Sequence, residues 1–250
     1  FPIQNIPFGI FKTTDKNICA GSRIGEYAID LDALQKLNYF DGINLNPNIF
    51  NKKTLNDFLK LGKPVWREVR DRIAEIFDKN NTMEESHKAI ILSKIDKVEM
   101  LMPVNVGDYT DFYSSRQHAY NVGCMFRDPN NALLPNWLHI PVGYHGRASS
   151  IILSGTNIHR PKGQQLPPDS DTPTFGPCKL LDFELEMAFV TGQGKKLGES
   201  ISTQEADDYI FGMCIFNDWS ARDIQKWEYV PLGPFLGKSF ASSISPWIVT

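Results

Sequence analysis

Three acidic residues in a strand-like stretch are the part of this sequence best suited to hold a cation. Asp182, Glu184 and Glu186 alternate with apolar residues over residues 181–187. Successive side chains of a β-strand point to opposite faces, so the carboxylates share one face while apolar neighbours such as Phe183 can enter a core. Carboxylates on one face repel each other. Either water or a divalent cation compensates them, and this stretch alone leaves both readings open.

A second carboxylate precedes a predicted short helix. Ser114 and Gln117 have the spacing of a capping box, which places Asp111 just before the helix and His118 within its second turn. A lone histidine is more often structural than catalytic, so this segment by itself is a weak signal.

A third acidic segment follows an apolar run over residues 210–216. This run predicts a buried strand that delivers Asp218 to a site at the edge of a sheet. A helix beginning near Asp218 would carry Arg222, Gln225 and Tyr229 on one face, at i+4, i+7 and i+11. The alternative is an N-cap aspartate followed by a solvated helix face.

Lys238 follows this helix closely and stands between glycines and aromatic residues. It can reach the same cleft, although a single lysine in a loop is usually a surface residue. A phosphate-binding loop is excluded, because GxxxxGK[ST] requires glycine where Leu232 stands.

The side chains available for metal binding are oxygen donors. The five histidines form no HxxxH or HExxH pair, and the four cysteines are scattered, so zinc spacing is absent from the sequence. Carboxylates from distant segments suit hard cations such as Ca²⁺ or Mg²⁺. The candidate oxygen ligands are Asp111, Glu184, Glu186 and Asp218.

The elements that must position these groups fall into two predicted domains. Residues 1–102 combine short strand signals with apolar stripes of helical period, the longer one formed by Val65, Val69, Ile73 and Ile76. Residues 103–250 are rich in proline, glycine and aromatics, which favours a β-rich domain with long loops. We therefore expect a mainly β fold with some α-helix.

Composition narrows the functional class. A chain of 250 residues with 42% hydrophobic residues can bury a substantial core, and its net charge of -3 gives no footprint for nucleic acid or anionic membrane. No apolar run reaches the ~18 residues of a membrane span. Scattered cysteines fit reduced thiols in a cytosolic protein. The start at Phe1 and the apolar end over residues 247–250 suggest a truncated chain.

Five blocks of this sequence together strongly resemble the fumarylacetoacetate hydrolase family: residues 111–119, 139–147, 182–186, 217–225 and 233–239. The resemblance implies an N-terminal SH3-like barrel, a mixed β-roll catalytic domain and a cytoplasmic homodimer. It also implies hydrolysis of the carbon–carbon bond of 4-fumarylacetoacetate to fumarate and acetoacetate, the last step of tyrosine and phenylalanine catabolism. No nucleic-acid or membrane partner is expected.

The resemblance also implies roles at matching positions. The metal ligands would be Asp111, Glu184, Glu186 and Asp218, with Ca²⁺ favoured at four carboxylates, and a Mg²⁺ site would involve Lys238 and Ser242. His118 would be the general base, while Arg222, Gln225 and Lys238 would stabilise the leaving carbanion. The substrate pocket would use Tyr113, Arg127, Tyr144 and Tyr229. Asp182 receives no ligand role.

Two further hypotheses remain from the sequence. One is a related hydrolase or decarboxylase that acts on another β-diketone or 2-oxo acid, and the other is a non-catalytic metal-binding fragment. The resemblance places a glutamate that orients the base histidine, and a substrate-contacting threonine, beyond Thr250. We therefore expect a polypeptide of residues 1–250 alone to show no turnover.

Overall fold

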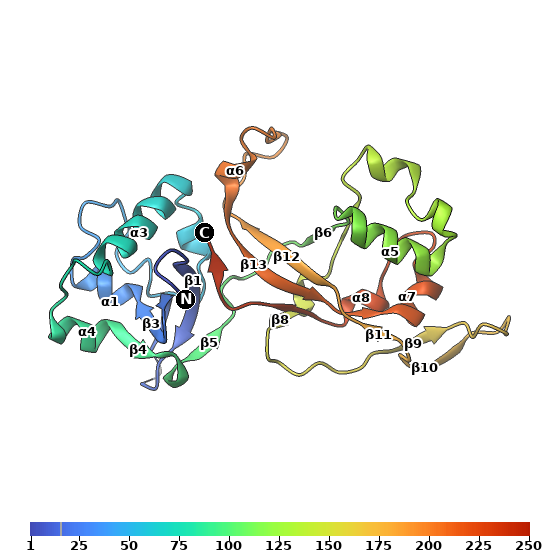
Figure 1. The fold of residues 1–250 in the computed structure, drawn as a ribbon, viewed down its shortest axis with the longest axis horizontal. Helices are drawn as coiled ribbons and strands as arrows, with labels where there is room; N and C mark the ends of the chain where they lie inside the picture. Colours follow the sequence, from blue (N-terminus) through green and yellow to red (C-terminus); the bar gives the residue numbers. More distant parts are fainter. Residues whose placement is uncertain (16) are drawn as a thin grey trace. The chain divides into compact units, whose positions relative to one another are not determined.

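The computed structural model describes residues 1–15 and 17–250 (Figure 1). The described chain forms two compact units. Unit 1 contains Phe1–Asn105, Glu186–Phe216 and Ile244–Thr250, and unit 2 contains Val106–Leu185 and Asn217–Ser243. Each unit is therefore built from segments that are distant in the sequence. The division into contiguous domains at residues 1–102 and 103–250 stays a prediction.

Unit 1 is a sheet with helices beside it. Its strands are β1 (Pro7–Lys12), β2 (Ile18–Ile24), β3 (Tyr27–Asp30), β4 (Leu92–Lys94), β5 (Glu99–Leu101), most of β12 (Leu185–Thr191), most of β13 (Ile210–Asp218) and β16 (Ile248–Val249). Its helices are α1 (Leu31–Lys36), α2 (Asn56–Leu59), α3 (Lys63–Ile76), α4 (Glu85–Ile91), α6 (Ala206–Tyr209) and the 3₁₀ turn η1 (Ile95–Lys97).

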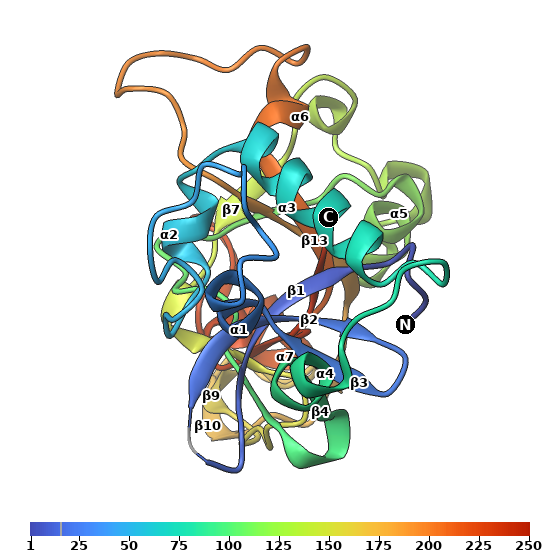
Figure 2. The same cartoon turned by 90° about the vertical axis from the view of Figure 1, so that its left-hand side faces the viewer.

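The strands of unit 1 pair in the order β4-β3-β2-β1-β16-β13, with β5 also on β1 and β12 on β13. Figure 2 shows β1, β2 and β3 as neighbouring ribbons, and their pairing is antiparallel. Gly25, in the turn between β2 and β3, has a φ of +54°, a conformation that glycine adopts without steric cost. Among the described residues this order is open, and the closure of an SH3-like barrel stays a prediction.

Helix α3 confirms the prediction from apolar periodicity. It begins after Gly62, whose φ is +82°, and Pro64 occupies its first turn, where the missing N–H is tolerated. Val69 and Ile73 are fully buried, as expected for the core-facing stripe. Trp66 adds an edge-to-face contact with Phe211 of β13, at 5.2 Å between ring centroids. This contact ties the helix to a strand that lies far along the chain.

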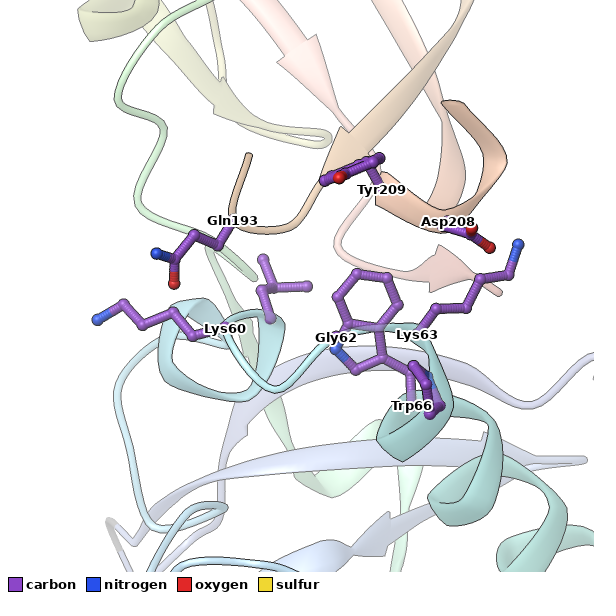
Figure 3. Close-up of a pocket in the computed structure, with 9 residues that line it drawn as sticks. Lys60, Gly62, Lys63, Trp66, Gln193, Asp208 and Tyr209 are labelled. Atoms are coloured by element: carbon purple, nitrogen blue, oxygen red, sulfur yellow. The ribbon is translucent and has the colours of Figure 1, made fainter. Parts of the chain in front are cut away.

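A pocket of about 350 Å³ lies at the start of α3 (Figure 3). Lys60, Lys63 and Trp66 line it from one side, and Asp208 and Tyr209 line it from α6. Lys63 forms an ion pair with Asp207. The residues that line this pocket include none of those predicted to do chemistry.

Unit 2 consists of short elements joined by long loops. Its strands are β6 (Thr110–Phe112), β7 (Gly143–His145), β8 (Ile151–Leu153), β9 (Lys162–Gln165), β10 (Thr174–Pro177), β11 (Leu181–Asp182), β14 (Ser220–Ala221) and most of β15 (Ser242–Ile244). Its helices are α5 (Arg116–Phe126), α7 (Arg222–Glu228), α8 (Leu236–Ser239) and the turns η2 (Pro129–Asn131), η3 (Pro135–Leu138) and η4 (Ala148–Ser150). The expectation of a mainly β fold with some helix is confirmed.

The prediction for residues 181–187 was partly wrong. The stretch is two strands, β11 and β12, separated by Phe183 and Glu184. Phe183, Leu185 and Met187 do not enter a core, since they are 64%, 74% and 59% exposed. Glu184 instead is buried, because cationic side chains compensate its charge.

No helix in the described part of the chain combines the length and apolar character needed to cross a membrane.

Candidate metal centre and catalytic side chains

Four carboxylates from three separate segments converge on one point. Asp111 comes from β6, Asp218 from the end of β13, Glu184 from the break before β12, and Glu186 from β12 itself. One oxygen of each lies within 4.8 Å of the others. The structure thus brings together the four residues predicted as ligands. Their role as ligands stays a prediction.

The backbone beside Glu184 explains why it lies next to Asp218. The Glu184 N–H donates to the side-chain oxygen of Asn217 at 3.2 Å, and the Asp218 N–H donates to the Glu184 carbonyl at 3.2 Å. Because β11 ends at Asp182, these bonds replace regular sheet pairing at the break. They hold the two carboxylates at one position.

Lys238 supplies positive charge to this cluster. Its Nζ lies 2.7 Å from Glu184 Oε2 and 2.9 Å from Asp218 Oδ2, and its side chain is 6% exposed. Lys238 lies in the short helix α8, beside α7 (Figure 1). The alternative of a surface loop lysine was therefore wrong. Ser242 also points at the cluster, donating from Oγ to Asp218 Oδ1 at 2.9 Å.

Arg222 is the second buried cation. Its Nη2 lies 2.6 Å from Glu184 Oε1, its Nε donates to Asp182 Oδ2 at 2.9 Å, and its Nη1 donates to Gln225 Oε1 at 3.1 Å. The predicted helix start near Asp218 was wrong, because β13 continues through Asp218 and α7 begins at Arg222. The i, i+3 spacing from Arg222 to Gln225 nevertheless puts both on one helix face.

The charges in this cluster shift pKa values in opposite directions. Burial would raise the pKa of Glu184, but the charges of Lys238 and Arg222 outweigh it and hold the pKa at about 2. Burial, reinforced by the charge of Asp218, raises the pKa of Asp111 to about 7. The charge of Lys238 therefore compensates Asp111 less fully than it does Glu184. A divalent cation at this position would favour its ionised form.

His118 lies at the edge of the cluster. Its Nε2 is 3.8 Å from Glu184 Oε1, and its ring packs edge-to-face on Tyr113 at 5.6 Å between centroids. The predicted capping box on Ser114 was displaced by one residue: Ser115 is the N-cap and its Oγ accepts from the His118 N–H at 3.4 Å. His118 thus sits in the first turn of α5, with its side chain 35% exposed.

The four predicted substrate-pocket residues have different surroundings. Tyr144 donates from its hydroxyl to Asp218 Oδ2 at 2.9 Å, and burial raises its pKa. The Tyr113 hydroxyl donates to the Ala119 carbonyl at 3.0 Å. Arg127 donates from Nη2 to the carbonyl of Ala132 at 2.7 Å. Tyr229 is the C-cap of α7, and its ring lies 5.3 Å from that of Phe126. Of these four, Tyr144 hydrogen-bonds directly to a clustered carboxylate.

Tyr109 is a site residue that the sequence reasoning missed. Its hydroxyl donates to Asp111 Oδ2 at 3.3 Å. Side chains two apart along an extended segment share a face, so the spacing of Tyr109 and Asp111 was a usable signal. Asn217 was also missed as the side chain that fixes the Glu184 backbone.

The donor set fits a hard divalent cation. Carboxylate oxygens each offer two acceptor positions, so Glu184 and Asp218 can bind a cation while they keep their bonds to Lys238 and Ser242. The fit is weaker for the predicted second site. The Lys238 ammonium group has only donors, so Lys238 could bind a Mg²⁺ ion only through its main-chain carbonyl oxygen.

Comparison with known proteins shows the family of this chain. The family model described as "Fumarylacetoacetate (FAA) hydrolase C-terminal" matches residues 109–250, and "Fumarylacetoacetase N-terminal" matches residues 4–103. The chain belongs to the fumarylacetoacetate hydrolase family. It is 52% identical over 256 residues to the fumarylacetoacetase of Dictyostelium discoideum and 52% identical over 254 residues to that of Homo sapiens.

These matches cover 100% of this chain but 60% of each relative, so the chain spans less than two thirds of the relatives' length. Among solved structures, the fumarylacetoacetate hydrolase from psychrophilic Exiguobacterium antarcticum aligns with a TM-score of 0.52 at 17% identity. That alignment covers 98% of this chain and 66% of that one, and it supports the family's fold.

Proposed function

We propose that this chain carries the metal site and several catalytic side chains of an enzyme that hydrolyses 4-fumarylacetoacetate to fumarate and acetoacetate, in tyrosine and phenylalanine catabolism. The observation that carries the proposal is the convergence of four carboxylates with Lys238, Arg222 and His118. The 52% identity to fumarylacetoacetases supports the choice of substrate. The proposed activity is that of a protein as long as these relatives, of which this chain matches 60%.

Asp111, Glu184, Glu186 and Asp218 would hold the divalent cation, for which Ca²⁺ is the proposed identity because carboxylate-rich sites suit it. When bound, such an ion acts as a Lewis acid toward substrate oxygens. Mg²⁺ near Lys238 and Ser242 is the proposed second ion.

His118 would take the proton from the water that attacks one carbonyl of the 1,3-diketone. Its Nε2 lies close to Glu184, and its partly exposed ring can reach a water molecule at the edge of the cluster. Collapse of the tetrahedral adduct breaks the carbon–carbon bond, and the electron pair leaves as the enolate of acetoacetate. Protonation of this enolate at carbon completes the reaction.

Arg222 and Lys238 would stabilise the negative charge that develops on oxygen during this cleavage. Both are already held against Glu184 by short ion pairs, so they are oriented before substrate arrives. The amide of Gln225 is turned by its bond from Arg222, which leaves its NH₂ group as a donor. Tyr113, Tyr144, Tyr229 and Arg127 would line the pocket, and Arg127 can pair with a substrate carboxylate.

The test measures hydrolysis of 4-fumarylacetoacetate by the full-length protein, monitored as the loss of the diketone absorbance. His118→Ala should lower kcat at least 100-fold, since general base catalysis contributes roughly 10²–10⁴-fold. His159→Ala, at an exposed histidine of the same unit, should leave kcat unchanged. Unchanged turnover in His118→Ala would remove the base assignment, and preference for another β-diketone or a 2-oxo acid would redirect the proposal to a related hydrolase or decarboxylase.

A homodimer and a cytoplasmic location are also proposed, on the basis of the family. Light scattering after size exclusion would measure the mass of the full-length protein. A monomer would contradict the first, and recovery from another cell fraction would contradict the second.

A further inference from the structure

Asp182 is the acidic residue of the 181–187 stretch that lies outside the group of four clustered carboxylates. It nevertheless contacts the centre through Arg222, whose guanidinium is shared among Asp182, Glu184 and Gln225. A carboxylate, an arginine and a second carboxylate therefore form a continuous chain of charge-assisted bonds that ends at the candidate metal site.

The position of Asp182 is fixed by its surroundings. β11 pairs with β14, so that Asp182 lies opposite Ser220, and the Arg222 N–H donates to the Leu180 carbonyl at 2.9 Å. One carboxylate oxygen of Asp182 accepts from the Phe183 N–H at 2.9 Å, and the other accepts from Arg222 Nε at 2.9 Å. Both oxygens are thus engaged before any ligand arrives.

Two cationic side chains, Arg222 and Lys238, compete with a metal ion for Glu184. Arg222 Nη2 is 2.6 Å from its Oε1 and Lys238 Nζ is 2.7 Å from its Oε2, and Glu184 is only 7% exposed. A divalent cation at Glu184 must share it with two positive groups. Asp182 gives Arg222 a second anion, which lowers the net positive field that Arg222 exerts on Glu184. Loss of this carboxylate would leave Glu184 as the remaining anion bonded to the guanidinium.

We propose that Asp182 is a positioning residue, which orients Arg222 and balances its charge so that Glu184 stays able to bind a divalent cation. The inference rests on the proposed metal site. Outer-shell partners of this kind change metal affinity by roughly 10–100-fold when they are replaced. A purely structural ion pair would instead change stability and leave cation affinity as it is.

A double-mutant cycle separates these two roles. The full-length protein and its variants Asp182→Asn, Arg222→Gln and the double variant are titrated with Ca²⁺ alone by calorimetry. Asp182→Asn should weaken Ca²⁺ binding about 10-fold. In the Arg222→Gln background the same change should have less than about a twofold effect, because the charge it balances is gone. Arg222→Met, which also removes the positive charge, replaces Arg222→Gln if the latter does not fold.

Asp223→Asn is the matched control. This variant also removes one negative charge next to Arg222 in the sequence. The Asp223 carboxylate, however, accepts from the Lys179 N–H at 2.7 Å and contacts Cys178 Sγ at 2.9 Å. Its Ca²⁺ affinity should stay within about twofold of wild type, since its partners lie outside the chain of bonds to Glu184. Equal losses in Asp182→Asn and Asp223→Asn would overturn the specific role of Asp182.

A second readout keeps the inference separate from the metal proposal. The NMR signal of Arg222 Nε–H, assigned with Arg222→Lys, should be shifted downfield and slow to exchange in the wild type, and should lose both properties in Asp182→Asn. Wild-type protein that binds no Ca²⁺ would overturn the metal site and the charge-balancing role together. An Nε–H signal unchanged in Asp182→Asn would overturn the orientation of Arg222 as well.

Discussion

Replacing Lys238 with methionine removes the ammonium group that lies between Glu184 and Asp218 and keeps most of the side-chain volume. The two carboxylates are 7% and 1% exposed, so water cannot replace the lost cation. Removing one partner of a buried ion pair costs about 3–5 kcal/mol. For a chain of this size each kcal/mol lowers Tm by about 2–4 °C, so we expect a fall of roughly 6–20 °C.

Lys60→Met is the control for this experiment. Lys60 lies 2.9 Å from Asp57, the same distance as Lys238 from Asp218, but the two side chains are 62% and 47% exposed. An exposed pair contributes about 0–1 kcal/mol, so its Tm should change by at most a few degrees.

Thermal unfolding followed by circular dichroism, with and without Ca²⁺, measures both variants. A cation that binds the native state stabilises every variant with an intact site, so Ca²⁺ should raise the Tm of Lys238→Met by more than that of Lys60→Met, in which the competing ammonium group remains. Equal Tm changes in the two variants would show that burial does not amplify the Lys238 pairs, and the electrostatic reasoning for the whole cluster would fail.

Two further predictions concern pH and packing. The folded-state pKa of Asp111 is raised from 3.8 to about 7, so the metal-free fold should lose stability as pH rises from about 4 to 7. The free energy of unfolding in urea should depend less on pH in Asp111→Asn than in the wild type. An equal pH dependence in both proteins would contradict the raised pKa. Gly21→Ala places a Cβ 2.2 Å from the Phe11 ring and should cost about 1–3 kcal/mol in urea unfolding. Gly107→Ala meets no neighbour within 4 Å and should change stability by less than about 0.5 kcal/mol, so equal effects would contradict the packing of β1 on β2.

Much of the local structure was predictable from the sequence because its causes are local. The apolar stripe of α3 and the proline in its first turn specify a helix by period and backbone chemistry, and the structure has it at Lys63–Ile76. The types of the candidate ligands were equally readable, because hard cations need oxygen ligands and the chain offers carboxylates in three segments.

Element boundaries were less predictable where two adjacent residues can do the same task. Ser114 and Ser115 are both helix-capping residues, and the structure uses Ser115. The strand that delivers Asp218 pairs with β12, β15 and β16, and the helix expected near Asp218 begins only at Arg222. Such pairing depends on segments that are distant in the sequence.

The sequence by itself determined which residues can bind a cation, which can carry protons and charge, and the family to which they point. Only the tertiary structure decided which face of the 181–187 stretch is buried. Alternation predicts two faces but not which one packs inward, and here the carboxylate side is inside because Lys238 and Arg222 compensate it. The bond from Arg222 to Asp182 has the same origin, since burial makes each charge depend on partners that the chain brings from elsewhere.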